Sequence, residues 1–219
     1  MNNLLLSRKW SKFLRYRRFF SFVPFLDFVI IAGSLALGNV HENSDFDVIV
    51  GVRAGRIFTV RAFCLFIFGA LGLRRKGKDG KAASSDKVCF SHFVTPAAYR
   101  LSPPYNDYWR ALYHGIAPVY GREKAVREFF KANDWVGGKP AADWKRFKPT
   151  IFNPARIFLE FVLHEFLGDI FEKFVKKIQL ERTKKSLKRD AGYKPRLRYD
   201  DEELEFHPDT RRIEEMLKQ

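Results

Sequence analysis

Cysteine and long apolar runs are scarce in this chain of 219 residues, and each scarcity excludes a class of protein. Cys64 and Cys89 are its two cysteines, too few for a disulfide framework or a cysteine-based zinc site. The longest apolar stretch, Ala62 to Leu73, has 12 residues, whereas a membrane-spanning helix needs roughly 18. We therefore expect no transmembrane segment and a reducing, cytoplasmic location.

Acidic side chains are also scarce relative to basic ones. Lys and Arg number 40 against 25 Asp and Glu, a formal net charge of +15, which favours an anionic partner such as a nucleotide, a nucleic acid or an acidic membrane face. Basic residues cluster from Arg8 to Arg18, Arg74 to Lys81 and Arg182 to Arg198. A solvated face explains any one cluster, but three together indicate nucleic acid or another polyanion as a partner.

Hydrophobic residues make up 46% of the chain, enough for one sizeable core, and phenylalanine is unusually abundant at 23 copies. The longest predicted helical segment, 153–188, carries an aromatic and aliphatic stripe that we interpret mainly as a packing face. Contact with a second copy or a helical partner protein, and binding to a membrane surface, are the alternatives. The stripe consists of Ile157, Phe158, Phe161, Leu163, Phe166, Ile170, Phe171 and Phe174.

Residues 1–22 have the pattern of a basic amphipathic helix. Apolar side chains at helical spacing would dock on the rest of the protein, with basic side chains outside. An organellar transit peptide is the alternative. The apolar set is Leu6, Trp10, Phe13 and Leu14, and the basic set is Arg8, Lys9, Lys12 and Arg15.

Residues 23–100 read as an αβ unit. Short apolar and β-branched runs predict strands at 25–32, 45–51 and 88–95, and the wide apolar face of 54–73 predicts a buried helix. Residues 74–87 are rich in Gly, Lys and Ser and read as a loop. The fold class that we predict is α+β.

Residues 101–199 are predicted to form a helical C-terminal part, with helices over 105–115, 124–132 and 153–188 and loops at Pro118, Gly121, Gly137-Gly138 and Pro149. Residues 200–219 form an acidic tail. Because the preceding segment is basic, the tail would either fold back on it or lie free.

The strongest chemical signal is Gly33-Ser34, ten further residues, and then Asp45-Phe46-Asp47. Residues two apart in a strand point to the same face, so Asp45 and Asp47 can share a hard cation such as magnesium. Gly33 allows a phosphate to approach the backbone, and Ser34 adds a hydroxyl donor beside the amides of a helical turn. This set therefore predicts a phosphate and metal site.

These residues resemble the signature of the minimal nucleotidyltransferases of the DNA polymerase beta superfamily: GS, ten residues, then DxD. The resemblance covers roughly residues 25 to 95. It implies a polymerase-beta-like core, a small mixed sheet with helices on one side. It also implies Mg²⁺ held by Asp45 and Asp47, and a nucleoside triphosphate whose phosphates lie by Gly33 and Ser34.

One position departs from that family pattern. Members usually carry a third carboxylate on a later strand, whereas the predicted strand 88–95 contains no acidic residue. Asp86 stands just before this strand, and Ser91 and His92 lie within it. These three residues are the candidates for the missing ligand.

The resemblance implies a magnesium-dependent transferase that moves a nucleotidyl group from a nucleoside triphosphate to a hydroxyl of RNA, a protein or a small molecule. Asp45 and Asp47 would be catalytic, and Gly33 and Ser34 would bind the nucleotide. Because the third carboxylate is missing, the alternative is a weak or inactive module of this fold that binds nucleic acid or a helical partner protein.

Overall fold

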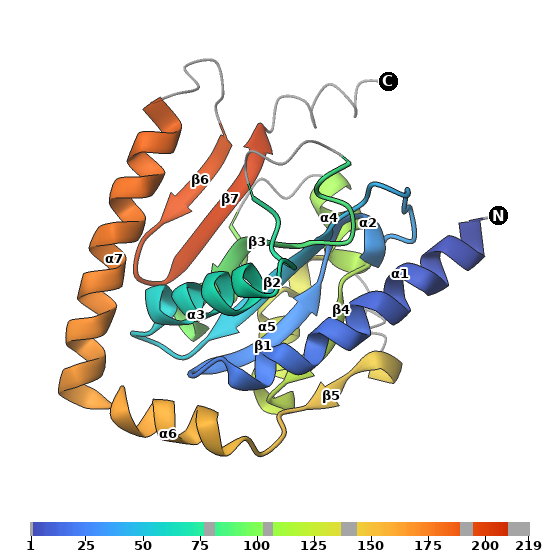
Figure 1. The fold of residues 1–219 in the computed structure, drawn as a ribbon. Helices are drawn as coiled ribbons and strands as arrows, with labels where there is room; N and C mark the ends of the chain where they lie inside the picture. Colours follow the sequence, from blue (N-terminus) through green and yellow to red (C-terminus); the bar gives the residue numbers. More distant parts are fainter. Residues whose placement is uncertain (1, 77–81, 103–106, 137–143, 189–194, 210–219) are drawn as a thin grey trace.

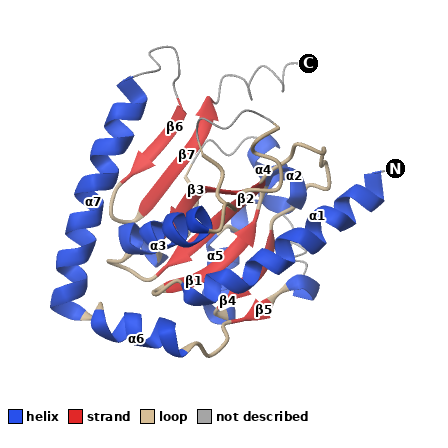
Figure 2. Cartoon of the chain, viewed as in Figure 1, coloured by secondary structure: helices blue, strands red, loops and turns tan. Residues whose placement is uncertain are grey.

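The computed structural model describes residues 2–76, 82–102, 107–136, 144–188 and 195–209. It is an α+β structure built on one mixed sheet of seven strands in the order β5-β4-β1-β2-β3-β7-β6 (Figures 1 and 2). The strands are β1 Leu26–Ile31, β2 Phe46–Val52, β3 Val88–Val94, β4 Ala117–Gly121, β5 Lys148–Pro149, β6 Pro195–Tyr199 and β7 Glu203–Asp209.

Helices cover both faces of this sheet, so the expectation of helices on one side alone was wrong. One core layer joins α1 (Asn2–Tyr16), the 3-10 helix η1 (Arg17–Phe22), α3 (Ile57–Ala70) and α7 (Glu165–Lys188) to the sheet. The other joins α4 (Asp107–His114) and α5 (Glu123–Ala132) to the opposite face. The remaining α-helices are α2 (Gly33–Ala36) and α6 (Pro154–Val162).

The elements predicted for residues 23–100 are present in the predicted order. β1, β2 and β3 fall within the three predicted strands or one residue beyond them, and α3 lies inside the predicted helix. β1 and β2 are antiparallel, whereas β2 and β3 are parallel. Every residue of β1 is buried, which explains its continuous apolar run.

The expectation that residues 101–199 form a helical part with loops at Pro118, Gly121 and Pro149 was wrong in part, because these three residues lie in β4 and β5. The loop expected at Gly137-Gly138 lies outside the described residues. The predicted helices are there as α4, α5, α6 and α7, but β4 pairs with β1, and β5 pairs with β4. The sheet therefore does not end near residue 100. The later part of the chain extends it at both edges.

Pro118 is the reason that β4 escaped prediction, because proline normally marks a loop or an edge strand. The β1–β4 pairing shifts register between Val29 and Ile30, opposite Tyr120 and Pro118. Such a bulge releases one residue from the ladder, so a proline is accommodated beside a fully buried strand.

The acidic tail does fold back on the basic segment. β6 and β7 form an antiparallel hairpin, and β7 also pairs with β3. Residues 210–219 of the predicted tail lie outside the described residues.

The N-terminal helix is confirmed, but one of its basic residues is not outside. Trp10 and Phe13 are buried in the core, as the apolar stripe predicts. Lys9, predicted to face solvent, is 1% exposed and lies beneath the loops that flank β2 and β3. Within the described residues, no helix is both long and apolar enough to cross a membrane.

Candidate active site

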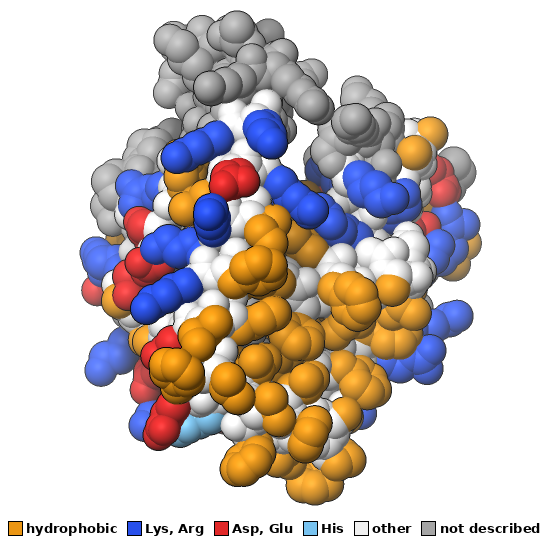
Figure 3. Space-filling model, turned by 60° about the vertical axis from the view of Figure 1, so that its left-hand side comes forward, with side chains coloured by type: hydrophobic (Ala, Val, Ile, Leu, Met, Phe, Trp, Pro, Cys, Tyr) orange, Lys and Arg blue, Asp and Glu red, His pale blue; other side chains and the backbone are white. Residues whose placement is uncertain are grey.

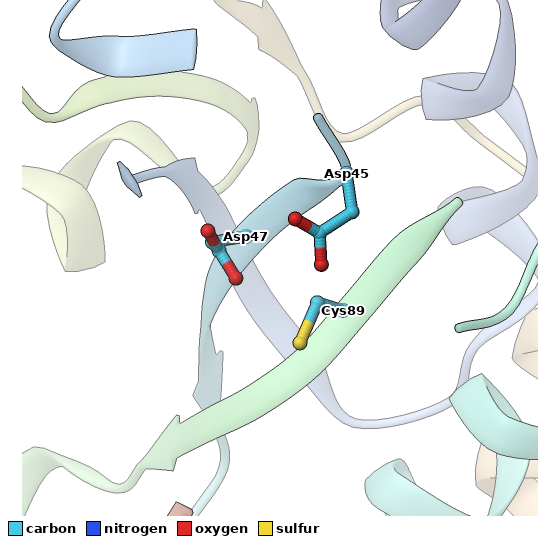
Figure 4. A group of neighbouring side chains, drawn as sticks. All are labelled: Asp45, Asp47 and Cys89. Carbon is cyan, nitrogen blue, oxygen red and sulfur yellow. The ribbon is translucent and has the colours of Figure 1, made fainter. Parts of the chain in front are cut away.

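The side chains of Asp45, Asp47 and Cys89 meet at the start of β2 and β3 (Figure 4). One oxygen from each carboxylate and the Cys89 Sγ atom all lie within 4.8 Å of one another. Asp45 directly precedes β2 and Asp47 is its second residue, so the strand periodicity places both on one face, as predicted. All three side chains are partly exposed.

Gly33 lies directly against this pair of carboxylates. Its φ is +64°, and a Cβ atom built on it would lie 2.2 Å from an Asp47 carboxylate oxygen. Any side chain at this position would therefore both strain the backbone and displace Asp47. The glycine of the GS pair is required by the close approach of α2 to β2.

The backbone holds the GS turn and the DxD strand together. The amide of Ala32 donates to the carbonyl of Asp47 at 3.0 Å. Ser34 follows in the short helix α2 and is half-buried. The structure thus brings Gly33, Asp45 and Asp47 to one place, with Ser34 next to them in the chain.

Arg75 pairs with Asp45, a contact that sequence reasoning missed. Its Nη1 atom donates to the Asp45 Oδ2 atom at 2.6 Å and lies 3.8 Å from Cys89 Sγ. The arginine follows α3 in the chain and lies beside the bridge between Arg74 and Val88, where its amide donates to the carbonyl of Val88 at 3.0 Å. In the sequence, Arg75 stands at the start of a segment that reads as a polar loop, and nothing local distinguishes it from the other basic residues there.

Burial and the neighbouring Asp45 carboxylate raise the pKa of Asp47 to about 7. Two carboxylates at this distance cannot both ionise cheaply, and a single arginine offsets only part of their repulsion. Asp47 therefore holds a proton over part of the neutral range. This is the electrostatic condition in which an added cation is most favourable.

Cys89 occupies the position at which a third carboxylate was sought. In the parallel pairing of β2 with β3, Asp47 is the register partner of Cys89. Burial, and then the two carboxylates, raise the pKa of its thiol. Cys89 is therefore a neutral thiol at physiological pH, and it contributes no negative charge to the site.

Neither Asp86 nor His92 joins the two aspartates in that group. Ser91 lies two residues beyond Cys89 on β3 and hydrogen-bonds to it. Asp86 instead pairs with Lys9 at 2.9 Å and with Lys12 at 2.7 Å.

Lys9 fixes the loops on which the site is built. Its ammonium group donates to the carbonyls of Glu42 at 2.6 Å and Ser44 at 2.9 Å. Its ion pair with Asp86 ties the loop before β2 to the loop before β3. A buried cation with several acceptors is well satisfied, so α1 sets the position of Asp45 through Lys9.

His92, the third suggested residue, belongs to a second polar cluster between β3 and β7. Its Nε2 atom lies 2.9 Å from Glu203 Oε1, and Glu205 is its register partner. Arg198 of β6 contacts Glu203 at 3.2 Å and Glu205 at 3.9 Å. His92, Glu203 and Glu205 are all less than 5% exposed.

In the cluster of Asp45, Asp47 and Cys89, the two carboxylates suit a hard divalent cation. Carboxylate oxygens are the ligands that Mg²⁺ prefers, and Mg²⁺ usually completes its shell with waters and substrate phosphates. A thiol is a poor ligand for it. Asp45 and Asp47 therefore fit Mg²⁺, whereas Cys89 does not add to its binding.

Comparison with known proteins adds no family to this geometry. No protein-family model, no curated protein and no solved structure matches the chain.

Proposed function

We propose that the protein is a magnesium-dependent nucleotidyltransferase, which uses a nucleoside triphosphate to modify a hydroxyl group. The observation that carries the proposal is the contact between Gly33 and the Asp47 carboxylate, with Asp45 close enough to share a cation. A GS turn and a DxD strand that meet in this way match the resemblance noted in the sequence. The buried β1–β2 ladder gives them a rigid support.

Asp45 and Asp47 would hold Mg²⁺, which would supply charge neutralisation for the phosphates. Before binding, a proton neutralises Asp47 over part of the neutral pH range, and Arg75 offsets the negative charge of Asp45. Asp47 would have to lose that proton to act as a metal ligand. Arg75, which lies beside Asp45, has the planar donor geometry that suits a phosphate oxygen.

The transfer forms a bond from the acceptor hydroxyl oxygen to the α-phosphorus and breaks the bond from that phosphorus to the bridging oxygen of pyrophosphate. The hydroxyl proton must pass to a base. Cys89 cannot accept this proton, because its raised pKa keeps the thiol protonated. Asp45 and Asp47 are the carboxylates of this cluster that could accept it.

The site is tested by calorimetric titration of ATP, GTP, CTP and UTP with and without Mg²⁺. We expect Mg²⁺-dependent binding of at least one nucleotide by the wild type, and its loss in Asp45→Asn/Asp47→Asn. Asp134→Asn is the matched control, because Asp134 is 73% exposed and pairs with Arg100. Equal binding by the wild type and the double variant would refute the proposal.

Cys89 favours a second candidate, a module that binds nucleotide or nucleic acid without turning it over. With a thiol in the third position, the site has one carboxylate fewer than the family pattern requires. Pyrophosphate release with RNA or polypeptide acceptors separates the two candidates. Mg²⁺-dependent binding without release would favour the binding module, and Cys89→Asp would then test whether a third carboxylate restores turnover.

A further inference from the structure

The helices α6 and α7 expose an aromatic face that the core does not use. Figure 3 shows hydrophobic side chains gathered over one side of the molecule, with Lys and Arg side chains beside them. Phe152, Phe161 and Phe166 are 81%, 79% and 75% exposed. The aromatic face, as defined here, comprises Ile151, Phe152, Ile157, Phe158, Phe161, Val162, Phe166, Leu167, Ile170 and Phe174, each exposed by 36% or more.

Several polar side chains of these helices point inward instead. Glu160 accepts a hydrogen bond from the Phe25 amide at 2.8 Å, and Glu172 accepts from the amides of Phe58 and Thr59 at 2.8 and 2.7 Å. A surface helix normally buries its apolar stripe and exposes its charges. Here carboxylates anchor the helices to β1 and α3, so the apolar side chains are left to face outward.

The aromatic face continues into a basic one along α7. At about 3.6 residues per turn, Phe166 and Ile170 lie on the same side of the helix as Lys177 and Lys184, and all four are exposed. From Lys173 to Lys188 the helix carries seven basic residues and one acidic residue, Glu181. One side of α7 is thus apolar at its start and cationic towards its end.

We propose that α6 and α7 form a docking surface for an anionic lipid bilayer. Phenylalanine and aliphatic side chains would enter the boundary between headgroups and acyl chains, while the lysines contact acidic headgroups. This is the pattern of helices that lie in the plane of a membrane interface. The inference is independent of the nucleotidyltransferase proposal, since it uses none of the same residues.

Charge selects the bilayer over a second copy of the chain. A homodimer through this face would bring two chains of +15 together, with the basic part of each α7 beside the interface, and like charges oppose such a contact. An acidic membrane face instead attracts them. Figure 1 places α6 and α7 along the side of the molecule away from α2, so docking there leaves the candidate active site open.

The proposal is tested by cosedimentation of the full chain with vesicles of phosphatidylcholine, with and without phosphatidylglycerol. We expect binding that depends on phosphatidylglycerol. Phe158→Ser/Phe161→Ser/Phe166→Ser should reduce the vesicle partition coefficient by about tenfold or more. These side chains are 65% or more exposed, so the variant should keep the wild-type circular dichroism spectrum and melting temperature.

Leu4→Ser is the matched control, because Leu4 is 82% exposed on α1 and lies outside the aromatic face. It should bind vesicles as the wild type does. Lys177→Gln/Lys184→Gln should weaken binding to phosphatidylglycerol vesicles by roughly tenfold.

Three results would overturn the proposal. The first is absence of vesicle binding by the wild type. The second is undiminished binding by the triple phenylalanine variant, which would mean adsorption through charge alone. The third is a wild-type dimer that the triple variant converts to a monomer with no change in vesicle binding, which would assign the face to a second copy.

Discussion

Two polar clusters lie along β3, one at Cys89 and one at His92, and they differ in exposure and in the partners of their carboxylates. At the start of the strand, Cys89 meets Asp45 and Asp47, which are partly exposed and have Arg75 as a cationic neighbour. Further along, His92 meets Glu203 and Glu205, which are buried and share Arg198. Each cluster has the composition of a metal site, but their surroundings give them different roles.

The difference lies in what each cluster lacks. The buried cluster has an arginine and a histidine beside its two carboxylates, and these residues come from β3, β7 and β6. We interpret it as a polar network that fastens the β6–β7 hairpin to β3. The other cluster is short of positive charge, so the pKa of Asp47 is raised. Unrelieved repulsion within reach of solvent is typical of a functional site.

The largest expected effect is on the buried cluster. Glu205→Ala should lower the free energy of unfolding by about 3 kcal/mol, because it removes a fully buried carboxylate that pairs with Arg198. Urea denaturation followed by circular dichroism measures it. Asp201→Ala, at the turn of the same hairpin, removes an exposed pair with Lys176 and should cost less than about 1 kcal/mol. Equal losses would mean that the buried network has no special role.

A smaller effect is expected from the buried cation that supports the site. Lys9→Met should lower the free energy of unfolding by about 2 kcal/mol, because two loop carbonyls lose their donor and Asp86 loses one of two partners. Lys12→Met is the matched control, since Lys12 is 46% exposed and contacts the same carboxylate. It should change stability by about 0.5 kcal/mol or less. If Lys12→Met lowered the free energy of unfolding as much as Lys9→Met, the burial of Lys9 would not explain its effect.

The smallest expected effect is on the stability change caused by Asp47→Asn, which should depend on pH. Folding raises the pKa of Asp47 from 3.8 to about 7, so the folded state binds its proton more tightly. That contribution to stability is present below pH 3.8 and is lost as pH rises through 7. Asp47→Asn removes the titration, so without metal it should gain about 1.4 kcal/mol on the wild type between pH 6 and pH 8.

Thermal melts at pH 6 and pH 8 in the presence of a chelator measure that difference. A constant gap between wild type and Asp47→Asn across this range would contradict the raised pKa. Glu205→Ala, by contrast, should be destabilised at both pH values.

The part of the fold that the sequence predicted is the part governed by local pattern. β1, β2 and α3 were predictable because a buried strand is a continuous apolar run and a buried helix has a wide apolar face. β4 and the hairpin β6–β7 were missed because Pro118 and a charged sequence conceal strands whose pairing is non-local. Such strands form through partners distant in the sequence.

The same distinction applies to the candidate site. Asp45 and Asp47 were predictable, since two residues on one strand have a fixed relation. Cys89 and Arg75 come from a different strand and the loop before it, so their places depend on the β2–β3 register. Lys9 lies on the N-terminal helix, and the amphipathic pattern of that helix predicted that it faces solvent. Tertiary contacts alone place it beneath the loops.

The central claim is that the partly exposed cluster, and not the buried one, binds a divalent cation. The most direct test is titration of the metal-free protein with Mn²⁺, with the free ion followed by electron paramagnetic resonance. We predict one Mn²⁺ site in the wild type and in Glu205→Gln, and its loss in Asp47→Asn. Retention of the site in Asp47→Asn, or its loss in a folded Glu205→Gln, would contradict the account.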